Sequence, residues 1–197
     1  MKPLKTGIII LAAGSSSRLG QPKQLLKYKG KSLIQMTIDT AIKSRADTCV
    51  LVLGANLELI LKEIRNSKIN IVINNNWQNG MASGMQIGLA FLEKKLAPDQ
   101  VILILCDQPF VDSELINNII NQAESGKGII ACHYNGTLGV PALFSRKYFQ
   151  ELRGLIGSEG AKKVIYAHQD DLGKVDFPDG AIDIDTPDDY KKLTIED

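Results

Sequence analysis

Residues 8–23 read IIILAAGSSSRLGQPK, an apolar run followed by a Gly/Ser loop that carries two cations, Arg18 and Lys23. An apolar strand that ends in small residues leaves backbone N–H groups free to surround an anion, and the two cations add positive charge at the same place. The stretch lacks the glycine spacing of the dinucleotide-binding loop and of the P-loop. It therefore predicts a buried strand followed by a different kind of loop for a phosphate chain.

Strand-like and helix-like patterns alternate through the remainder of the chain. The β-rich runs are residues 7–11, 48–53, 69–73, 101–106 and 128–132, and the helical patterns are residues 32–44, 57–65, 81–95 and 112–124. Nearly continuous apolar strands separated by helices indicate parallel strands that are buried on both faces, so the predicted fold is an α/β three-layer sandwich. In such sheets ligands bind beyond the carboxyl ends of the strands, which is where the segments after Leu11 and Leu105 lie.

Composition indicates a globular protein of ordinary size. The 197 residues are 44% hydrophobic and 23% charged, which predicts one domain over residues 1–197. A net charge of +1 without a run of Lys and Arg argues against a nucleic-acid partner. The apolar runs are too short to cross a bilayer and no signal peptide is evident, so we expect a cytoplasmic protein without a membrane partner.

Cys49, Cys106 and Cys132 are odd in number and lie in or beside apolar runs. This pattern predicts buried free thiols rather than disulfides or a zinc site. The two histidines are far apart in the sequence, which argues against a histidine metal cluster.

Asp107 directly follows an apolar strand and precedes Gln108 and Pro109. Pro109 prevents a regular continuation of the strand, so the carboxylate is expected at the edge of the sheet, where it could hold a hard cation. On these residues alone, a turn or a helix cap explains the aspartate better.

The segment near the carboxyl terminus reads AIDIDTPDDY, residues 181–190. The alternation of Ile182 and Ile184 predicts a short strand. Thr186-Pro187 predicts the start of a helix, with acids in the first turn that complement the helix dipole.

Small residues open the helix that is expected from residue 81. Gly80 and Ser83 would let a ligand approach, or Gly would only ease packing of the helix against the sheet. Trp77, just before this helix, is either a stacking residue for a base or, as is more usual for a lone Trp beside a turn, a hydrophobic anchor.

Together these motifs resemble the MobA-like NTP transferases, and most closely their molybdenum cofactor cytidylyltransferase-like branch. The first matches the LAAGxSxRxGxxK signature, with Leu19 where Met is usual, at the positions Leu11, Ala12, Ala13, Gly14, Arg18, Gly20 and Lys23. The CDQP quartet at residues 106–109 resembles the family's metal-binding strand end, and residues 183–188 resemble its closing motif. The resemblance implies a Rossmann-like, mostly parallel sheet of the nucleotide-diphospho-sugar transferase type.

The resemblance also implies roles for particular residues. Mg²⁺ would be held by Asp107 and Asp185, a pair of carboxylates that suits this ion because it keeps waters and substrate oxygens as its other ligands. Arg18, Lys23 and Asp107 would be catalytic. The residues implied to bind the nucleotide are Leu11, Ala12, Ala13, Gly14, Arg18, Lys23, Gly80 and Ser83.

The implied reaction moves CMP from CTP to the terminal phosphate of a molybdopterin-type acceptor and releases pyrophosphate, with a molybdenum hydroxylase as the partner that receives the product. Ala13 supports CTP because relatives that transfer GMP usually have Gly there. The sequence departs from the family on the acceptor side, with Val140 where His is common, Ser158 in place of an acid and Lys162 in place of Arg. Two alternatives therefore stay open, a sugar or alcohol phosphate as acceptor and a non-catalytic carrier of the finished cofactor.

Overall fold

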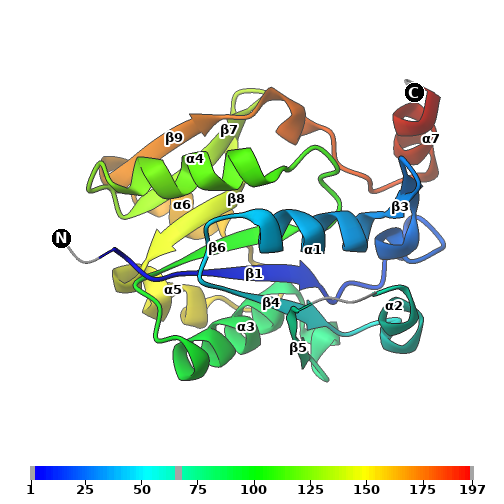
Figure 1. The fold of residues 1–197 in the computed structure, drawn as a ribbon, viewed down its shortest axis with the longest axis horizontal. Helices are drawn as coiled ribbons and strands as arrows, with labels where there is room; N and C mark the ends of the chain where they lie inside the picture. Colours follow the sequence, from blue (N-terminus) through cyan, green and yellow to red (C-terminus); the bar gives the residue numbers. More distant parts are fainter. Residues whose placement is uncertain (1–2, 65–67, 196–197) are drawn as a thin grey trace.

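A seven-stranded sheet forms the middle layer of the computed structural model, which describes residues 3–64 and 68–195 (Figure 1). Its order is β5-β4-β1-β6-β8-β7-β9. The strands are β1 (Thr6–Ala12), β4 (Thr48–Leu53), β5 (Asn70–Ile73), β6 (Gln100–Leu105), β7 (Ile129–Tyr134), β8 (Thr137–Ser145) and β9 (Leu172–Asp176). Strand β8 runs antiparallel to both neighbours and every other pairing is parallel. The mostly parallel sheet expected from the sequence is confirmed.

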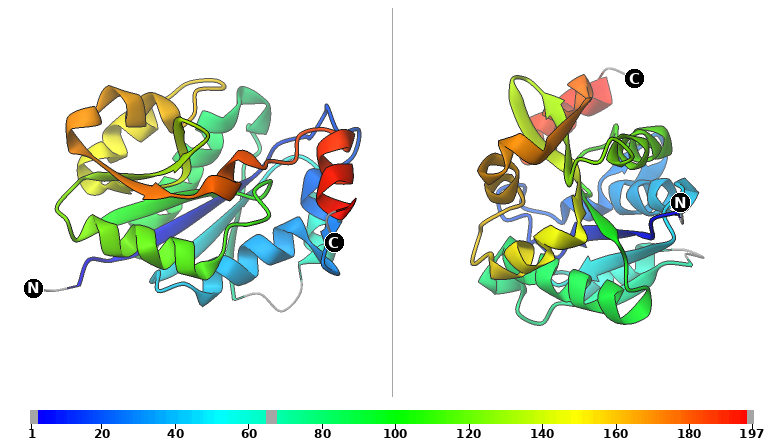
Figure 2. Two further views of the ribbon diagram at one scale, coloured as in Figure 1. Left: turned by 90° about the horizontal axis from the view of Figure 1, so that it is seen from above. Right: turned by 90° about the vertical axis from the view of Figure 1, so that its left-hand side faces the viewer.

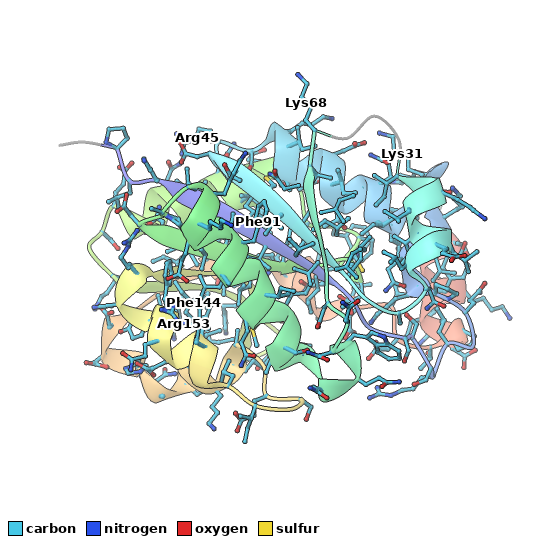
Figure 3. The ribbon with its side chains drawn as sticks, turned by 90° about the horizontal axis from the view of Figure 1, so that it is seen from below. Lys31, Arg45, Lys68, Phe91, Phe144 and Arg153 are labelled. Atoms are coloured by element: carbon cyan, nitrogen blue, oxygen red, sulfur yellow. The ribbon has the colours of Figure 1, made fainter. Side chains whose placement is uncertain are left out.

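Helices cover both faces of this sheet, which completes the predicted three-layer arrangement (Figures 1 and 2). They are α1 (Leu33–Lys43), α2 (Leu57–Glu63), α3 (Met81–Lys95), α4 (Ser113–Ala123), α5 (Phe149–Gly154), α6 (Lys162–Ala167) and α7 (Pro187–Ile195). Helices α1 and α4 lie on one face, and α3 and α5 lie on the other. Figure 3 shows α3, with Phe91, beside α5, with Arg153, and an ion pair of 3.0 Å joins Arg153 to Glu93 of α3.

The apolar run of β1 serves both faces at once. Ile8 and Ile10 enter the hydrophobic cluster under α1 and α4, whereas Ile9 enters the cluster under α3 and α5. Successive side chains of a strand point to opposite faces, so a strand that is covered on both sides is apolar throughout. This is why a continuous run of Ile and Leu, rather than an alternating one, was the correct signal for a central strand.

Local signals place the helices that border the site. Ser32 caps α1 by accepting a hydrogen bond from the backbone of Gln35, and Asp112 caps α4 by accepting one from the backbone of Leu115 at 2.8 Å. A short hairpin of β2 (Lys27–Tyr28) and β3 (Lys31–Ser32) leads into α1. The strands and helices expected from residue 7 to residue 132 are present, with bounds that differ from the prediction by two residues at most, and the predicted end of the second helix at Arg65 lies outside the described residues.

Strand β8, which contains Gly139 and Pro141, was not among the strands expected from the sequence. The pairing with β7 jumps from Ala131–Ala142 to Cys132–Gly139, so Val140 and Pro141 have no partner in that ladder. Proline lacks a backbone N–H, and this irregularity is what admits it to an interior strand.

The prediction of a short strand at Ile182 and Ile184 is wrong. The chain there is an irregular connection between a 3₁₀ turn, residues 178–181, and α7. The backbone N–H of Ile184 donates to the carbonyl oxygen of Asp107 at 3.0 Å, and the Ile184 side chain is fully buried beside Leu19 and Leu33. The apolar alternation therefore marks one anchor residue rather than a strand.

Other expectations hold. The last helix begins at Pro187, and the three cysteines are buried and free. Burial raises the pKa of each thiol to about 12, which leaves them inert at neutral pH. No helix in residues 3–64 or 68–195 is both long and apolar enough to cross a membrane.

Candidate active site

The site lies where β1 and β6 end side by side. These strands are parallel neighbours and Leu11 pairs with Leu105, so the loop after β1 and Asp107 after β6 emerge at the same edge of the sheet. The β1 arrow in Figure 1 points toward the side of the molecule that holds α7, and residue 185 lies on the connection into that helix. Three segments that are distant in sequence therefore converge at one place.

Lys23 is the centre of this convergence. Its Nζ lies 2.5 Å from Oδ2 of Asp107 and 2.9 Å from Oδ1 of Asp185. Arg18 reaches the other oxygen of Asp185, with Nη1 at 3.3 Å from Oδ2. The side chains of Lys23 and Asp107 are 18% and 11% exposed, whereas that of Arg18 is 78% exposed.

The electrostatics of the group keep Lys23 charged. Burial alone would lower its pKa, but the charge of Asp107 and hydrogen bonds to both carboxylates outweigh burial, and the pKa lies well above its ordinary value. One buried cation thus faces two carboxylates. Oδ1 of Asp107 is buried without a hydrogen-bond partner among the described residues, a costly arrangement for a carboxylate oxygen.

These residues fit a divalent metal ion. Asp107 and Asp185 share the ammonium group of Lys23, and Oδ1 of Asp107, which has no partner among the described residues, gives the pair a further acceptor. Magnesium is commonly bound by one or two carboxylates together with substrate phosphates and waters. The part of the chain that the structure describes contains no cluster of three or more His, Cys, Asp or Glu side chains with metal-binding geometry, so substrate oxygens would have to supply the remaining ligands.

A cavity of about 510 Å³, here called the donor cavity, opens beside Lys23 and Asp107. Seven of the predicted nucleotide-binding residues line it: Leu11, Ala12, Ala13, Gly14, Arg18, Lys23 and Gly80. Trp77 and Gly84 also line it, so the tryptophan has a face available to a ligand.

Ser83 is the predicted contact that the structure does not bring to the donor cavity. Its Oγ accepts a hydrogen bond from Asn74 Nδ2 at 2.8 Å and lies 2.8 Å from the carbonyl oxygen of Gly80. The hydroxyl is therefore engaged in holding the start of α3. Its role as a nucleotide contact stays a prediction.

A second cavity of about 290 Å³, here called the acceptor cavity, lies on the other side of Asp107. Leu105 and Asp107 line both cavities. The other lining residues of the acceptor cavity are Gln108, Tyr134, Asn135, Thr137, Val140, Lys162, Gly180, Ala181 and Asp183. Asp107 thus stands between two hollows, which is the arrangement that a reaction between two substrates requires.

An apolar pocket of about 270 Å³ shares lining residues with both cavities. Val140, Ser158 and Lys162, the three departures that the sequence analysis assigned to the acceptor side, all line it. Val140 and Lys162 also line the acceptor cavity, whereas Ser158 also lines the donor cavity.

Several residues of the site were given no role by the sequence. Gln108 donates hydrogen bonds from Nε2 to the carbonyl oxygens of Val140 at 3.1 Å and Gly180 at 3.3 Å, and so ties the end of β6 to β8. Tyr134 lines the acceptor cavity, and no motif marks its segment. Asp183 also lines this cavity and belongs to the segment that resembles the closing motif. Gln24 is buried next to Lys23. Its position in the sequence, between Lys23 and two leucines, was the available signal that a polar side chain is buried beside the site.

Comparison with known proteins agrees with this geometry. The model of the MobA-like NTP transferase domain matches residues 8–172. Purine catabolism protein PucB of Bacillus subtilis (strain 168) is 27% identical over 198 residues, 92% of each chain. Molybdenum cofactor guanylyltransferase of Aliivibrio salmonicida (strain LFI1238) is 24% identical over 204 residues, 98% of this chain and 97% of that protein. Nicotine blue oxidoreductase of Paenarthrobacter nicotinovorans is 31% identical over 126 residues, which span 64% of this chain and 60% of that protein.

Solved structures match nearly the whole chain. The crystal structure of Rv0371c from Mycobacterium tuberculosis H37Rv has a TM-score of 0.85 and 29% sequence identity, and the match covers 98% of each chain. A crystal structure of Rv0371c in complex with manganese has a TM-score of 0.79 and 27% identity, covering 96% of this chain and 97% of that one. The matched domain and the sheet with its converging loop and carboxylates lead to one conclusion: this chain belongs to the MobA-like NTP transferase family of nucleotidyltransferases.

Proposed function

We propose that this protein is a magnesium-dependent cytidylyltransferase that moves CMP from CTP to the terminal phosphate of a molybdenum-pterin cofactor and releases pyrophosphate. The observation that carries the proposal is the position of Lys23 between Asp107 and Asp185, with Asp107 lining both cavities. A cation, two carboxylates and a phosphate loop at the junction of two hollows suit the transfer of a nucleotidyl group between two phosphates.

On the donor side, the loop of residues 12–16 would receive the triphosphate. Arg18 and Lys23 would bind the β- and γ-phosphates and stabilise the charge that grows on the departing pyrophosphate. Mg²⁺ held by Asp107 and Asp185 would neutralise phosphate charge and lower the repulsion between the two anionic substrates. The manganese complex of Rv0371c supports a divalent ion in this fold.

On the acceptor side, the attacking atom is a phosphate oxygen of the pterin substrate. It forms a bond to the α-phosphorus of CTP while the bond between that phosphorus and the oxygen that bridges to the β-phosphorus breaks. Because a terminal phosphate is already ionised at neutral pH, no side chain needs to remove a proton. Lys162, which lines the acceptor cavity, is placed to bind this anion. The product would then pass to a molybdenum hydroxylase.

The choice of CTP rests on Ala13. Ala13 lines the donor cavity. A methyl group there reduces the space for a purine, and in the resemblance that supports this proposal Gly usually takes the place in proteins that transfer GMP.

The test is pyrophosphate release by purified protein with Mg²⁺, molybdenum-bearing pterin monophosphate and each nucleoside triphosphate in turn. We expect release with CTP and none when the acceptor is omitted. Release with GTP alone would overturn the base preference and keep the transferase. If none of the triphosphates gives pyrophosphate release, the proposal of a pterin acceptor is overturned.

A second candidate keeps the chemistry and changes the acceptor to a sugar or alcohol phosphate. The observation in its favour is that Val140, Ser158 and Lys162 line one pocket beside the acceptor cavity. The same assay with sugar phosphates and alditol phosphates separates the two. A non-catalytic carrier is disfavoured, because a carrier has no need of a buried Lys between two carboxylates.

A further inference from the structure

Gln24 is a buried polar residue beside the site to which the proposed mechanism gives no role. It follows Lys23 in a short 3₁₀ turn (Lys23–Leu25) and is 1% exposed. Burying an amide is costly unless its hydrogen bonds are made. The contacts of Gln24 therefore indicate why it is there.

The side-chain amide of Gln24 is hydrogen-bonded to the loop of residues 12–16, which would receive the triphosphate. Nε2 donates to the carbonyl oxygens of Ala12 and Gly14, both at 3.0 Å. Oε1 accepts from Oγ of Ser16 at 3.4 Å, and the same Oγ accepts from the backbone N–H of Lys23 at 3.1 Å. The loop, Gln24 and the residue that carries the central cation thus form one closed hydrogen-bonded unit.

These bonds decide where the loop's N–H groups point. In a planar trans peptide the C=O and the N–H of the following residue point in opposite directions. Because the carbonyl oxygen of Gly14 turns to Gln24, the N–H group of Ser15 points away from Gln24, and Ser15 lines the donor cavity. Ala13 faces the segment after β4 instead, where its carbonyl oxygen accepts a hydrogen bond from the backbone N–H of Ala55 at 3.0 Å. A loop whose amides surround an anion needs its carbonyl oxygens withdrawn in this way.

The loop also needs external support because Ser16 has a φ of 55°, in the left-handed region that costs a non-glycine residue free energy. The contacts from Gln24 and from the backbone of Lys23 to the Ser16 side chain offset that cost locally.

We infer that Gln24 is a positioning residue for triphosphate binding, which acts through the loop and touches no substrate. The inference rests on the proposed function for its effect on turnover, but its effect on phosphate binding can be measured without turnover. Gln24 holds the loop amides and Lys23 in one arrangement before the ligand arrives, so that binding costs less ordering.

The test compares Gln24→Met with Gln100→Met. Gln100 is a matched control because it is 3% exposed and donates from Nε2 to Oγ1 of Thr6 at 2.8 Å, at the other end of the same sheet. Binding of CTP and of inorganic triphosphate, each with Mg²⁺, is measured by calorimetry alongside thermal unfolding. We expect Gln24→Met to weaken both ligands by about tenfold or more, equivalent to about 1.4 kcal/mol, and Gln100→Met to leave them unchanged while it lowers the melting temperature.

A second variant covers the case in which Gln24→Met does not fold. In Gln24→Glu an ionised carboxylate would face the carbonyl oxygens of Ala12 and Gly14, whereas the protonated acid offers one donor again. Its affinity for inorganic triphosphate, relative to wild type at the same pH, should therefore recover as the pH falls. A ratio that is independent of pH would contradict the inference.

The outcomes separate this inference from the proposed function. Unchanged triphosphate binding by folded Gln24→Met, or an equal loss in Gln100→Met, overturns the role of Gln24 alone. Normal triphosphate binding by wild type without pyrophosphate release in any assay overturns the proposed function alone. A wild-type protein that binds no triphosphate overturns both.

Discussion

The two sides of Asp107 differ in how completely their polar groups are paired. On the donor side Lys23 contacts two carboxylates, Arg18 contacts one of them, and the loop is bonded from within. On the acceptor side, within the described residues, Lys162 and Asp183 have no ion pair. Lys23, Arg18, Asp107 and Asp185 are all in ion pairs before any ligand arrives, although Oδ1 of Asp107 has no hydrogen-bond partner among the described residues. The acceptor side leaves the charges of Lys162 and Asp183 for a ligand to satisfy.

In the proposed function, this difference separates the side chains that would carry out the transfer from those that would select the acceptor. Altering a buried ion pair lowers the stability of the fold, because removing one partner leaves the other charge buried and without compensation. Unpaired charges at an open cavity can be exchanged at little cost to stability. We therefore expect substitutions on the donor side to alter catalysis and stability, and substitutions on the acceptor side to alter specificity.

The largest effect is expected from Asp107→Ala. The variant removes the carboxylate that borders both cavities, and turnover should fall by about a thousandfold or more. The fold should persist, because the contact that Asp107 makes with Ile184 uses its main-chain oxygen. Pyrophosphate release and thermal unfolding measure the two effects.

Asp176→Ala is the control for loss of a carboxylate, since its side chain is 87% exposed and pairs with His133 at 3.2 Å. It should keep wild-type turnover. An unchanged rate in Asp107→Ala would remove the proposed metal site and with it the distinction between the two sides.

Lys23→Met should lower kcat by about a hundredfold and also destabilise the protein. Two carboxylates would then face one another without a cation, at a cost of about 2 kcal/mol, less than for a fully buried pair because Asp185 is 40% exposed. Manganese added without nucleotide should restore more stability to this variant than to wild type, because wild type already holds a cation there. Thermal unfolding with and without Mn²⁺ measures this.

Lys27→Met is the matched control, because Lys27 is 54% exposed and its ion pair with Glu63 lies at the surface. It should change neither rate nor metal response. Equal Mn²⁺ stabilisation of all three proteins would show that Lys23 and the metal do not share a place.

The fold could be predicted from the sequence because its central strands are buried on both faces. Ile8, Ile9 and Ile10 leave no room for another interpretation, since three consecutive apolar residues in a strand need cover on each side. The edge strand β9 was missed for the opposite reason. Its residues Leu172–Asp176 are half-buried or exposed and include Gly and Asp, so no apolar run marks them.

The sequence predicted residues that the structure brings together, but it did not predict their contacts. The motifs identified Lys23, Asp107 and Asp185, yet Lys23 and Asp185 are 162 positions apart and no local pattern shows that the amine bridges the two carboxylates. Likewise, the hydrogen bonds that occupy the hydroxyl of Ser83 come from Asn74 and from its own helix start, and they depend on how that loop folds back.

On the acceptor side, Lys162→Ala should raise the KM for the acceptor by about tenfold, since a hydrogen bond to a charged group contributes about 1.5–3 kcal/mol. The affinity for CTP should not change. Lys163→Ala is the neighbouring control, because Lys163 pairs with Glu159 at 2.5 Å and lines neither cavity. If Lys162→Ala weakened the binding of CTP as much as that of the acceptor, the two cavities would not bind their substrates independently.

The smallest effect should come from an ionic cluster that lines neither cavity. Asp171 accepts hydrogen bonds from Lys147 at 2.7 Å and from Tyr148 at 2.6 Å, and these hold its pKa at about 2. A lowered pKa contributes stability above the ordinary value of 3.8, and this contribution is lost as the pH falls toward 2. Asp171→Asn should therefore lower the free energy of unfolding by about 1 kcal/mol at pH 7 and by progressively less below pH 4. Urea unfolding at several pH values measures this.

Turnover of Asp171→Asn should equal that of wild type, because the side chains of this cluster are paired but line neither the donor cavity nor the acceptor cavity. Pairing alone would then account for stability, and pairing next to a cavity would be needed for catalysis. A loss of turnover in Asp171→Asn at neutral pH would show that removing a paired charge lowers turnover even where that charge lines neither cavity. The contrast between the two sides of Asp107 would then reflect how charges are paired rather than which substrate they face.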